Sequence, residues 1–461
     1  MLRSTLSKLM WVVRAPLMWV SIAPLVALAM VGLLASGAYA APSTFTVNST
    51  NDPGTGACDA TECTLREAIN AANANNNPTE KDRMKFDISG SGVHTISPTS
   101  PLPQITEPVI INGYSQPGSS ANTLAKGTNA VLTIELDGTE AGTGLDANGL
   151  GIGAKGTVVK GLVINSFAVS GIRLLGGADA NGTKIQGNFI GTDPAGTTAQ
   201  GNSSDGIALT GNSNVVVGGT LASMRNLISG SRLAGVVLFN FEAGTNNKVL
   251  GNLIGTDKNG SGNLGNGNSG VAIFARQPNN ATTVQNNTIA FNGNTTEPPA
   301  RATDGVVLFG DVGTTDTIRS NSIFANKGLG IDLIDFPAGE RGNTNVSNAN
   351  DPCDTDENTN DLQNKPNLTS ALTSSGTTTI KGSLNSNPNQ TFTVQFFRNP
   401  PGTNEGKTFL GQKSVSTGSN CTTGTFTFIP NQAVSVGQNI TATATDSEGN
   451  TSEFSAPRTI G

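Results

Sequence analysis

Apolar and polar residues alternate in short blocks that recur along the middle of the chain. One seven-residue block occurs twice, as GNFIGTD at Gly187–Asp193 and as GNLIGTD at Gly251–Asp257, 64 residues apart. Shorter copies surround these two at Arg225–Ile228, Asn286–Ile289 and Ser320–Ile323. Self-similarity at a period of tens of residues is typical of solenoid proteins, so the recurring positions indicate the fold class.

When the blocks are aligned, four columns of residue types recur. The first column holds asparagine, and the column two residues further on holds isoleucine. The third column, three residues before asparagine, holds isoleucine or valine, although Ser223 interrupts it in one coil; the fourth is a G-[IV]-x-[LI] motif. A coil without insertions has 26 residues, and three coils carry nine more at one corner. The asparagine column consists of Asn188, Asn226, Asn252, Asn287 and Asn321.

Three short β-branched strands per coil, separated by Gly and Asn turns, predict a right-handed parallel β-helix. Inward side chains then stack on their equivalents about 4.8 Å away in the next coil, and each buried Ile or Val contributes ~1.5–3 kcal/mol. Asparagine tolerates left-handed turns, and its amide can bond the amides above and below. The asparagine column is therefore predicted to form a structural ladder.

The first 40 residues have the pattern of a secretory signal peptide. Three basic residues, Arg3, Lys8 and Arg14, come before an apolar run from about Leu17 to Leu34. Small residues follow this run, and cleavage is predicted after Ala40. An uncleaved membrane anchor is the alternative, because the apolar run is long enough. Cleavage predicts a secreted or cell-surface protein whose mature chain has no membrane span.

Removal of this segment leaves 24 basic and 33 acidic residues, a net charge of −9. Such a balance disfavours nucleic acid as a partner, because nucleic-acid binding needs a cationic face. Four cysteines in an exported chain suggest two disulfides, and Cys58–Cys63 with Cys353–Cys421 is the simplest of three connectivities. A zinc site is disfavoured, since the cysteine spacing is wrong and the chain has a single histidine, His94.

A single amphipathic helix is predicted just after Cys63. Thr64 and Glu67 form a capping box, and Leu65, Ala68, Ile69 and Ala72 form an apolar stripe. Such a helix can cover the open end of a β-helix, where strand edges and apolar side chains would otherwise be exposed.

The segment CTLREA at Cys63–Ala68 resembles the CSLREA motif of bacterial secreted proteins, with Thr64 in place of serine. Together with the repeats, the resemblance covers roughly residues 44–350. It implies a pectate-lyase-like β-helix solenoid downstream of the motif, and it brings no agreed activity. The ending ATATDSEGNTSEFS at 442–455 is similar to the immunoglobulin-like sandwich modules that often accompany such proteins.

The predicted fold is therefore all-β, a right-handed parallel β-helix with an N-terminal capping helix and a C-terminal β-sandwich. The strand candidates between residues 93 and 160 lack clean columns, which suggests irregular early coils. The predicted boundaries are a signal peptide at 1–40, an N-terminal cap at 41–92, the β-helix at 93–342, an acidic linker at 343–365 and the sandwich at 366–461.

The acidic linker is the candidate for a metal site. Asp354, Asp356, Asn358 and Asp361 crowd oxygen ligands in a D-x-D-x-N pattern that is typical of calcium loops. Thr359 replaces the usual glycine and Lys365 the usual final glutamate, so a solvated linker is the alternative. Calcium is the one cofactor that the sequence suggests.

The three insertions (Gly191–Asp205, Gly255–Ser269 and Ala290–Asp304) are predicted to leave the same corner and form a binding face. Their acidic residues are candidate ligand-binding groups, although ordinary turn chemistry accounts for them equally. These candidates are Asp193, Asp205, Asp257 and Asp304.

No convergent Asp/Arg or His cluster, of the kind that β-helix lyases and hydrolases carry, is visible in the sequence. The sequence therefore favours a monomeric, non-enzymatic, adhesin-like protein that binds polysaccharides or cell-surface glycans. The alternatives are a glycan-active enzyme, above all a calcium-dependent polyuronate lyase, and a purely structural matrix or envelope component.

Overall fold

The computed structural model describes residues 40–54, 56–77, 80–240, 244–275, 281–294, 302–310, 314–335 and 345–461. The described residues lie in one compact unit, Tyr39–Gly461. The predicted signal segment lies outside the described residues except for Ala40. No described helix is long and apolar enough to cross a membrane.

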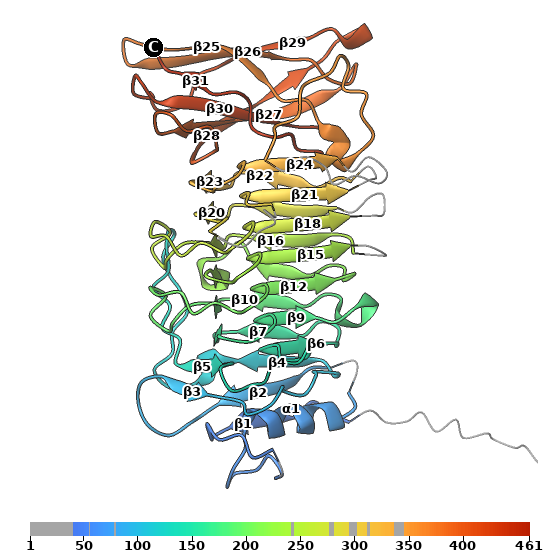
Figure 1. Ribbon diagram of the computed structural model, residues 1–461, viewed down its shortest axis with the longest axis vertical. Helices are drawn as coiled ribbons and strands as arrows, with labels where there is room; N and C mark the ends of the chain where they lie inside the picture. Colours follow the sequence, from blue (N-terminus) through green and yellow to red (C-terminus); the bar gives the residue numbers. More distant parts are fainter. Residues whose placement is uncertain are drawn as a thin grey trace, which may run out of the picture. The chain divides into compact units, whose positions relative to one another are not determined.

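The described part of the β-helix consists of three parallel sheets whose strands stack coil upon coil (Figure 1). Sheet A is ordered β1 (Thr44–Val47), β2 (Asp82–Phe86), β4 (Val109–Asn112), β7 (Val158–Lys160), β10 (Lys184–Gln186), β13 (Val216–Gly218), β16 (Asn247–Leu250), β19 (Thr282–Gln285) and β22 (Thr317–Arg319). Sheet B is ordered β3 (His94–Ile96), β5 (Ile134–Asp137), β8 (Val163–Asn165), β11 (Phe189–Ile190), β14 (Leu227–Ile228), β17 (Leu253–Ile254), β20 (Thr288–Ala290) and β23 (Ser322–Phe324). Sheet C is ordered β6 (Leu150–Ile152), β9 (Ile172–Leu174), β12 (Ile207–Thr210), β15 (Val236–Asn240), β18 (Val271–Ala275), β21 (Val306–Gly310) and β24 (Ile331–Asp335). The predicted parallel β-helix is confirmed.

The predicted columns correspond to buried stacks of equivalent side chains. In sheet B, Ile190 pairs with Ile228 and Ile228 with Ile254, and all three are buried. In sheet A, Val217 pairs with Ile185 and Val249. Val217 therefore takes the place that the sequence spacing assigned to Ser223. The spacing misleads because a 3-10 turn, Ala222–Met224, is inserted before Asn226.

The early coils are in register, contrary to the irregular coils expected from the sequence. β4 pairs with both β2 and β7, and β5 pairs with both β3 and β8. Residues 113–133 separate β4 from β5, and this long connection hid the 26-residue spacing. The connection also packs outside sheet B, where Leu132 and Tyr114 contact Phe189 and its neighbours.

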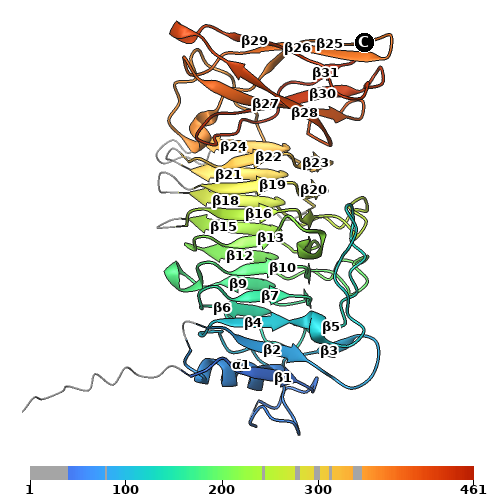
Figure 2. The same cartoon turned by 180° about the vertical axis from the view of Figure 1, so that it is seen from behind.

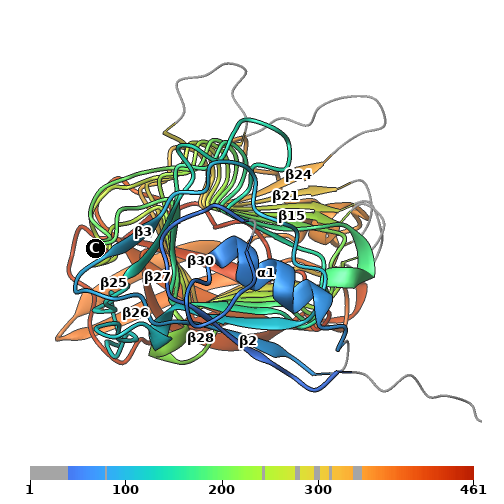
Figure 3. The same ribbon diagram turned by 90° about the horizontal axis from the view of Figure 1, so that it is seen from below.

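Helix α1 (Leu65–Ala74) lies across the N-terminal end of the coils (Figure 3). The Thr64 side chain accepts a hydrogen bond from the Glu67 backbone, and the Glu67 side chain caps the Thr64 backbone in return. Leu65 and Ile69 are buried in the β-helix core. Because β1 pairs with β2, parallel pairing already begins within residues 41–92.

The C-terminal region forms two antiparallel sheets that fit a β-sandwich. The first contains β25 (Asn367–Ser374), β26 (Thr377–Leu384) and β29 (Gly424–Phe428). The second is ordered β28 (Thr408–Ser416), β27 (Thr391–Asn399), β30 (Asn439–Thr445) and β31 (Arg458–Thr459). Their inward side chains, including Ile380, Phe396 and Ile440, form a separate hydrophobic core.

The sandwich supplies hydrogen-bond partners to the last strand of each β-helix sheet. In sheet A the Ile318 amide donates to the Thr451 hydroxyl at 3.0 Å, and in sheet C the Leu333 amide donates to Glu453 Oε1 at 3.3 Å. In sheet B, Ile323 and Gly406 exchange two backbone hydrogen bonds. Backbone amides of the last strands, which have no following coil to pair with, thereby gain hydrogen-bond acceptors.

The described part of the predicted linker, 345–365, is packed against the final coil. Thr359 and Asn360 are buried in a short 3-10 helix, Thr359–Leu362. The Thr359 hydroxyl donates to the carbonyls of Gly310 and Ile334. These residues are therefore not a solvated linker, because they satisfy backbone groups that the last coil leaves open.

Candidate functional site

The predicted insertions leave one corner, because each joins a strand of sheet B to the next strand of sheet C. The first two are small hairpins closed by the pairs Thr192–Ala199 and Thr256–Asn263. They stack on each other, since the Lys258 amide donates to the Gly196 carbonyl at 2.9 Å. We call these two hairpins, Thr192–Gln200 and Thr256–Leu264, the hairpin ridge. Residues 295–301 of the third insertion lie outside the described residues.

Asp193 and Asp257 serve their own hairpins. Asp193 Oδ1 accepts hydrogen bonds from the amides of Thr197 and Thr198 at 2.7 and 2.9 Å. Asp257 Oδ1 accepts from the amides of Ser261 and Gly262 at 3.0 and 2.8 Å. Partial burial opposes ionisation of Asp257, but these hydrogen bonds outweigh it and lower the pKa of the carboxyl. The two carboxylates shape turns.

Asp205 and Asp304 are buried and bond the backbone of the following coil. Asp205 Oδ1 accepts from the Ala234 amide at 3.0 Å, and Asp304 Oδ1 accepts from the Leu329 amide at 2.7 Å. Burial, and secondly the charge of Asp332, raises the pKa of Asp304 to about 8. Burial also raises the pKa of Asp332 to about 7. Neither Asp205 nor Asp304 is therefore presented to a ligand.

A pocket of about 240 Å³ lies where the last coil meets the sandwich. Lys365 and Glu453 are the charged residues in its lining, and they form an ion pair at 3.3 Å. The Glu453 carboxylate also accepts hydrogen bonds from the backbone of Leu333 and Asn348 and from the Ser347 hydroxyl. The Glu453 carboxylate is therefore already occupied by donors of the protein itself.

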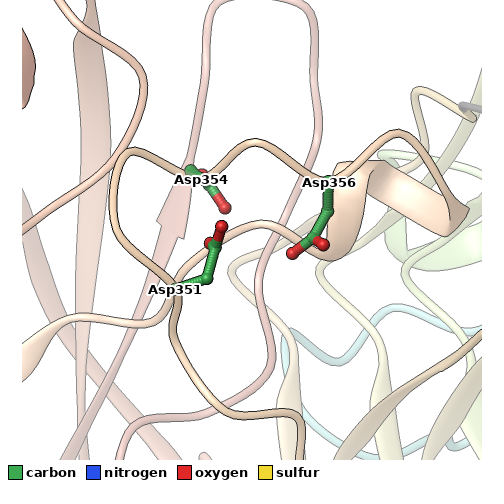
Figure 4. A group of neighbouring side chains, drawn as sticks. All are labelled: Asp351, Asp354 and Asp356. Atoms are coloured by element: carbon green, nitrogen blue, oxygen red, sulfur yellow. The ribbon is translucent and has the colours of Figure 1, made fainter.

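Three carboxylates come together in residues 345–365: Asp351, Asp354 and Asp356 (Figure 4). One oxygen from each lies within 4.8 Å of the others. Asp354 is buried and accepts hydrogen bonds from the Asn364 amide and the Gln363 side chain. Burial, and secondly the charges of Asp351 and Asp356, raises its pKa to about 7. Calcium prefers oxygen ligands, and carboxylates supply them.

Two of the four predicted metal ligands, Asp354 and Asp356, belong to this group, and Asp351 was missed. Asp361 does not belong to it, and Asn358 as a ligand stays a prediction. Asp361 instead accepts from the Asn450 side chain at 2.8 Å. Burial, and then the charge of Asp446, raises the pKa of Asp361 to about 6. Asp351 could have been found in the sequence, because it precedes Asp354 by three residues and Asp356 by five.

The predicted asparagine ladder is present, with each side-chain amide donating to the next, as from Asn188 to Asn226 at 3.2 Å and from Asn226 to Asn252 at 2.9 Å. A second ladder, missed in the sequence, stacks Asn266, Asn292 and Asn326 at the corner between sheets B and C. Glu405 of the sandwich ends it by accepting from the Asn326 side chain at 2.9 Å. Every member of both ladders is buried except Asn326, which is half-buried, and both ladders are structural.

The strands of sheet A run along one face of the β-helix (Figure 2). The outward positions of this sheet carry basic residues that were not predicted from the sequence. Every charged side chain at an outward position of the described sheet A strands is basic. The available signal was a lysine or arginine beside the inward column, as in Lys184–Ile185 and Lys248–Val249. We call these residues, with Lys81 next to β2, the cationic face: Lys81, Arg83, Lys85, Lys160, Lys184, Lys248 and Arg319.

No protein-family model matches the chain. No curated protein matches it either. Among solved structures, the crystal structure of pectate lyase Pel9A is similar with a TM-score of 0.36 and 12% sequence identity. That similarity covers 67% of this chain and 74% of the lyase.

Proposed function

We propose that the chain is a secreted or cell-surface, non-enzymatic protein that binds polysaccharides or cell-surface glycans in an adhesin-like manner. The observation that carries the proposal is the hairpin ridge, two stacked hairpins at one corner of a rigid solenoid. Their exposed parts are turns with small polar side chains, such as Thr197, Thr198 and Ser261. A surface ordered before binding loses little conformational entropy when a hydroxyl-rich ligand docks.

An extracellular location is supported by the two disulfides, Cys58–Cys63 and Cys353–Cys421, and by the predicted signal peptide. Membership of the CSLREA-motif proteins is part of the proposal. Its support is that the motif residues have separate roles: Arg66, for example, forms an ion pair with Asp52 at 2.8 Å and donates to the Ser100 and Pro101 carbonyls. The immunoglobulin-like assignment of the sandwich is proposed on its two antiparallel sheets.

A glycan-cleaving enzyme is the competing function, with a calcium-dependent polyuronate lyase as its clearest form. Such an enzyme needs an acid and a base beside an open cleft. The described carboxylates with a raised pKa are buried or partly buried near the C-terminal end of the coils and accept protein hydrogen bonds, as Asp316 does from the Thr282 amide. Their environment supports a structural role.

Deletion of the hairpin ridge tests the proposal. Removing the nine residues Thr192–Gln200 and the nine residues Thr256–Leu264 gives both coils the length of the hairpin-free coil Ile228–Val236. We expect an unchanged far-UV circular dichroism spectrum and at least about tenfold weaker binding to those glycans of a neutral and acidic panel that the parent binds. Retained binding would place the glycan site elsewhere.

The double substitution Asp193→Asn with Asp257→Asn is the matched control. Asparagine keeps the turn-forming oxygen, so glycan binding should persist if the carboxylates only shape the hairpins. Mass spectrometry of the incubated glycans, with and without calcium, measures cleavage in the same samples. Cleaved products would overturn the non-enzymatic proposal.

A further inference from the structure

The side chains of the cationic face point to the same side of sheet A, because they alternate with buried side chains along each strand. In β2, Arg83 and Lys85 are exposed while Met84 and Phe86 are buried. The paired strands place Lys184 two strands from Lys248 in one outward column, with Val216 between them. From β2 to β22 are seven interstrand steps, so the face extends about 34 Å along the stack.

The positive charges of this face make no ion pair with a described carboxylate, and Arg319 donates to Gln412 Oε1 at 3.3 Å. The two ion pairs found among the described residues, Arg66–Asp52 and Lys365–Glu453, involve none of the seven. The outward positions between the cations hold neutral residues such as Asn112, Gln186 and Gln285. The pKa of Lys81 is lowered by partial burial and then by the charge of Lys184, so these two like charges lie close together.

The concentration of charge is unusual for this chain, which has a formal net charge of −6. Neighbouring strands are about 4.8 Å apart, less than the Debye length of about 8 Å at physiological ionic strength. Lys160 and Lys184, on the neighbouring strands β7 and β10, therefore act together on a polymer that lies along the stack. Such a positive field attracts an anionic ligand although the whole chain repels one at long range.

We propose that the cationic face of sheet A binds a linear anionic polysaccharide that runs along the stack, across the strands. Seven cations over about 34 Å average one charge every ~5 Å. Three of them lie at β2 and one each on β7, β10, β16 and β22. Double-stranded DNA presents one charge per about 1.7 Å and would leave most phosphates uncompensated. A sugar polymer with one carboxylate or sulfate per residue has the lower charge density that this face can match.

A neutral side chain between the cations adds to this fit. Gln285 offers an amide donor and acceptor beside Arg319, as the hydroxyls of sugar rings require. Gln186 Nε2 already donates to the Gly218 carbonyl at 3.0 Å, and Asn112 Oδ1 is buried. Sheet A lies apart from the corner between sheets B and C that carries the hairpin ridge. The two surfaces can therefore be tested by separate variants.

The test measures binding of the full chain, with both disulfides formed, to alginate, dextran sulfate and uncharged dextran by isothermal titration calorimetry at two salt concentrations. We expect binding to one or both anionic polymers, none or much weaker binding to dextran, and lower affinity at higher salt. Alginate and dextran sulfate distinguish carboxylate from sulfate as the recognised group.

The variant Lys184→Gln with Lys248→Gln removes two charges from exposed positions of the face. We expect about fivefold weaker binding and a smaller salt dependence. The matched control is Lys126→Gln with Lys327→Gln, which removes two charges from exposed residues outside sheet A. Charge reversal, Lys184→Glu with Lys248→Glu, should weaken binding at least about tenfold, and circular dichroism verifies that each variant is folded.

The result that overturns the assignment is anionic-polymer binding that falls equally in the control and in the sheet A variants, or that does not fall in either. Tighter binding to duplex DNA or to anionic lipid vesicles would show that the partner class is wrong. Binding of neutral glycans through the hairpin ridge without polymer binding at sheet A would refute this assignment and leave the proposed function standing. If deletion of the hairpin ridge leaves polymer binding intact and the sheet A lysine variants weaken it, the sheet A assignment stands and the ridge is not the site of polymer binding.

Discussion

Asn252 illustrates how single polar residues hold the coils together. Its side-chain amide donates to the Val217 carbonyl and to Asn287 Oδ1, both at 3.0 Å, and its own oxygen accepts from Asn226. The residue is buried, so each of these groups would lack a partner if the side chain were shortened. Unpaired buried polar groups cost about 1–3 kcal/mol each.

Asn252→Ala should therefore lower the free energy of unfolding by about 3 kcal/mol, because several buried groups lose their partner together. Urea denaturation followed by circular dichroism measures the change. Asn259→Ala is the control, since Asn259 is exposed and its side chain bonds Asp257 of the same turn. Its expected effect is within about 0.5 kcal/mol. Equal losses in the two variants would contradict a structural ladder.

Asp304 and Asp332 should make the protein less stable as the pH rises. Both carboxyls are fully buried, each has an oxygen without a hydrogen-bond partner, and burial raises their pKa to about 8 and about 7. Between their unfolded pKa of about 3.9 and these folded values, the folded state binds more protons than the unfolded state. Stability should therefore fall as pH rises from about 4 through 8, and then level off for these groups.

Asp304→Asn should stabilise the protein at pH 9 by an amount on the order of a few kcal/mol, because it removes the buried charge. The same substitution should change stability little near pH 3, where both states of the wild type are mostly protonated. Chemical denaturation at the two pH values measures the difference. A uniform shift at both values would mean that the substitution acts through packing instead of ionisation.

At the scale of elements, the loop from Asn350 to Lys365 folds back on itself around buried Asp354, and Asn350 and Lys365 exchange two hydrogen bonds. Calcium binding by Asp351, Asp354 and Asp356 remains a prediction that thermal unfolding can test. Binding to the folded state alone would add about 1.4–2.7 kcal/mol when free calcium exceeds Kd by ten- to a hundredfold. The midpoint of unfolding should rise accordingly.

Asp356→Asn should abolish this calcium-dependent rise, while Asp137→Asn, a turn residue that accepts from the Thr139 amide, should preserve it. Magnesium, which demands a tighter octahedral geometry, should have a weaker effect. An unfolding midpoint that calcium does not change, in the wild type and both variants, would identify the three carboxylates as part of an ordinary polar loop.

At the scale of the whole described chain, the sandwich acts as the C-terminal cap of the β-helix. Phe397 and Phe454 belong to the same hydrophobic cluster as the coils. Hydrogen-bonding groups of Thr451, Gly406 and Glu453 satisfy the last strands of sheets A, B and C. A solenoid without its terminal cap exposes apolar coil residues and unpaired strand edges.

Truncation after residue 344 should therefore yield an aggregating or unfolded protein, although every strand of sheets A to C is retained. Size-exclusion chromatography and circular dichroism measure both outcomes. Glu405→Ala in the full chain is the graded version: it removes the acceptor of Asn326, and Glu405→Gln should restore stability because its oxygen can still accept. A soluble, monomeric truncated β-helix would contradict the capping role.

Local sequence was sufficient for the repeating part of the fold, because inward Ile and Val columns and the turn asparagines recur at a nearly constant spacing. Helix α1 and the pairing of Cys58 with Cys63 were predictable for the same reason, since their partners are close in the chain. The register of the early coils was not predictable, because the connection 113–133 interrupts the spacing.

The tertiary structure decided which polar residues meet across coils and which remain available. The sequence made four insertion carboxylates candidate ligand-binding groups, yet folding buries two of them and commits all four to backbone amides: Asp193, Asp205, Asp257 and Asp304. Lys184 and Lys248 lie 64 residues apart and share a surface only because successive coils stack in register. Contacts between distant residues depend on register and capping, which are cooperative properties of the whole chain and not of any local pattern.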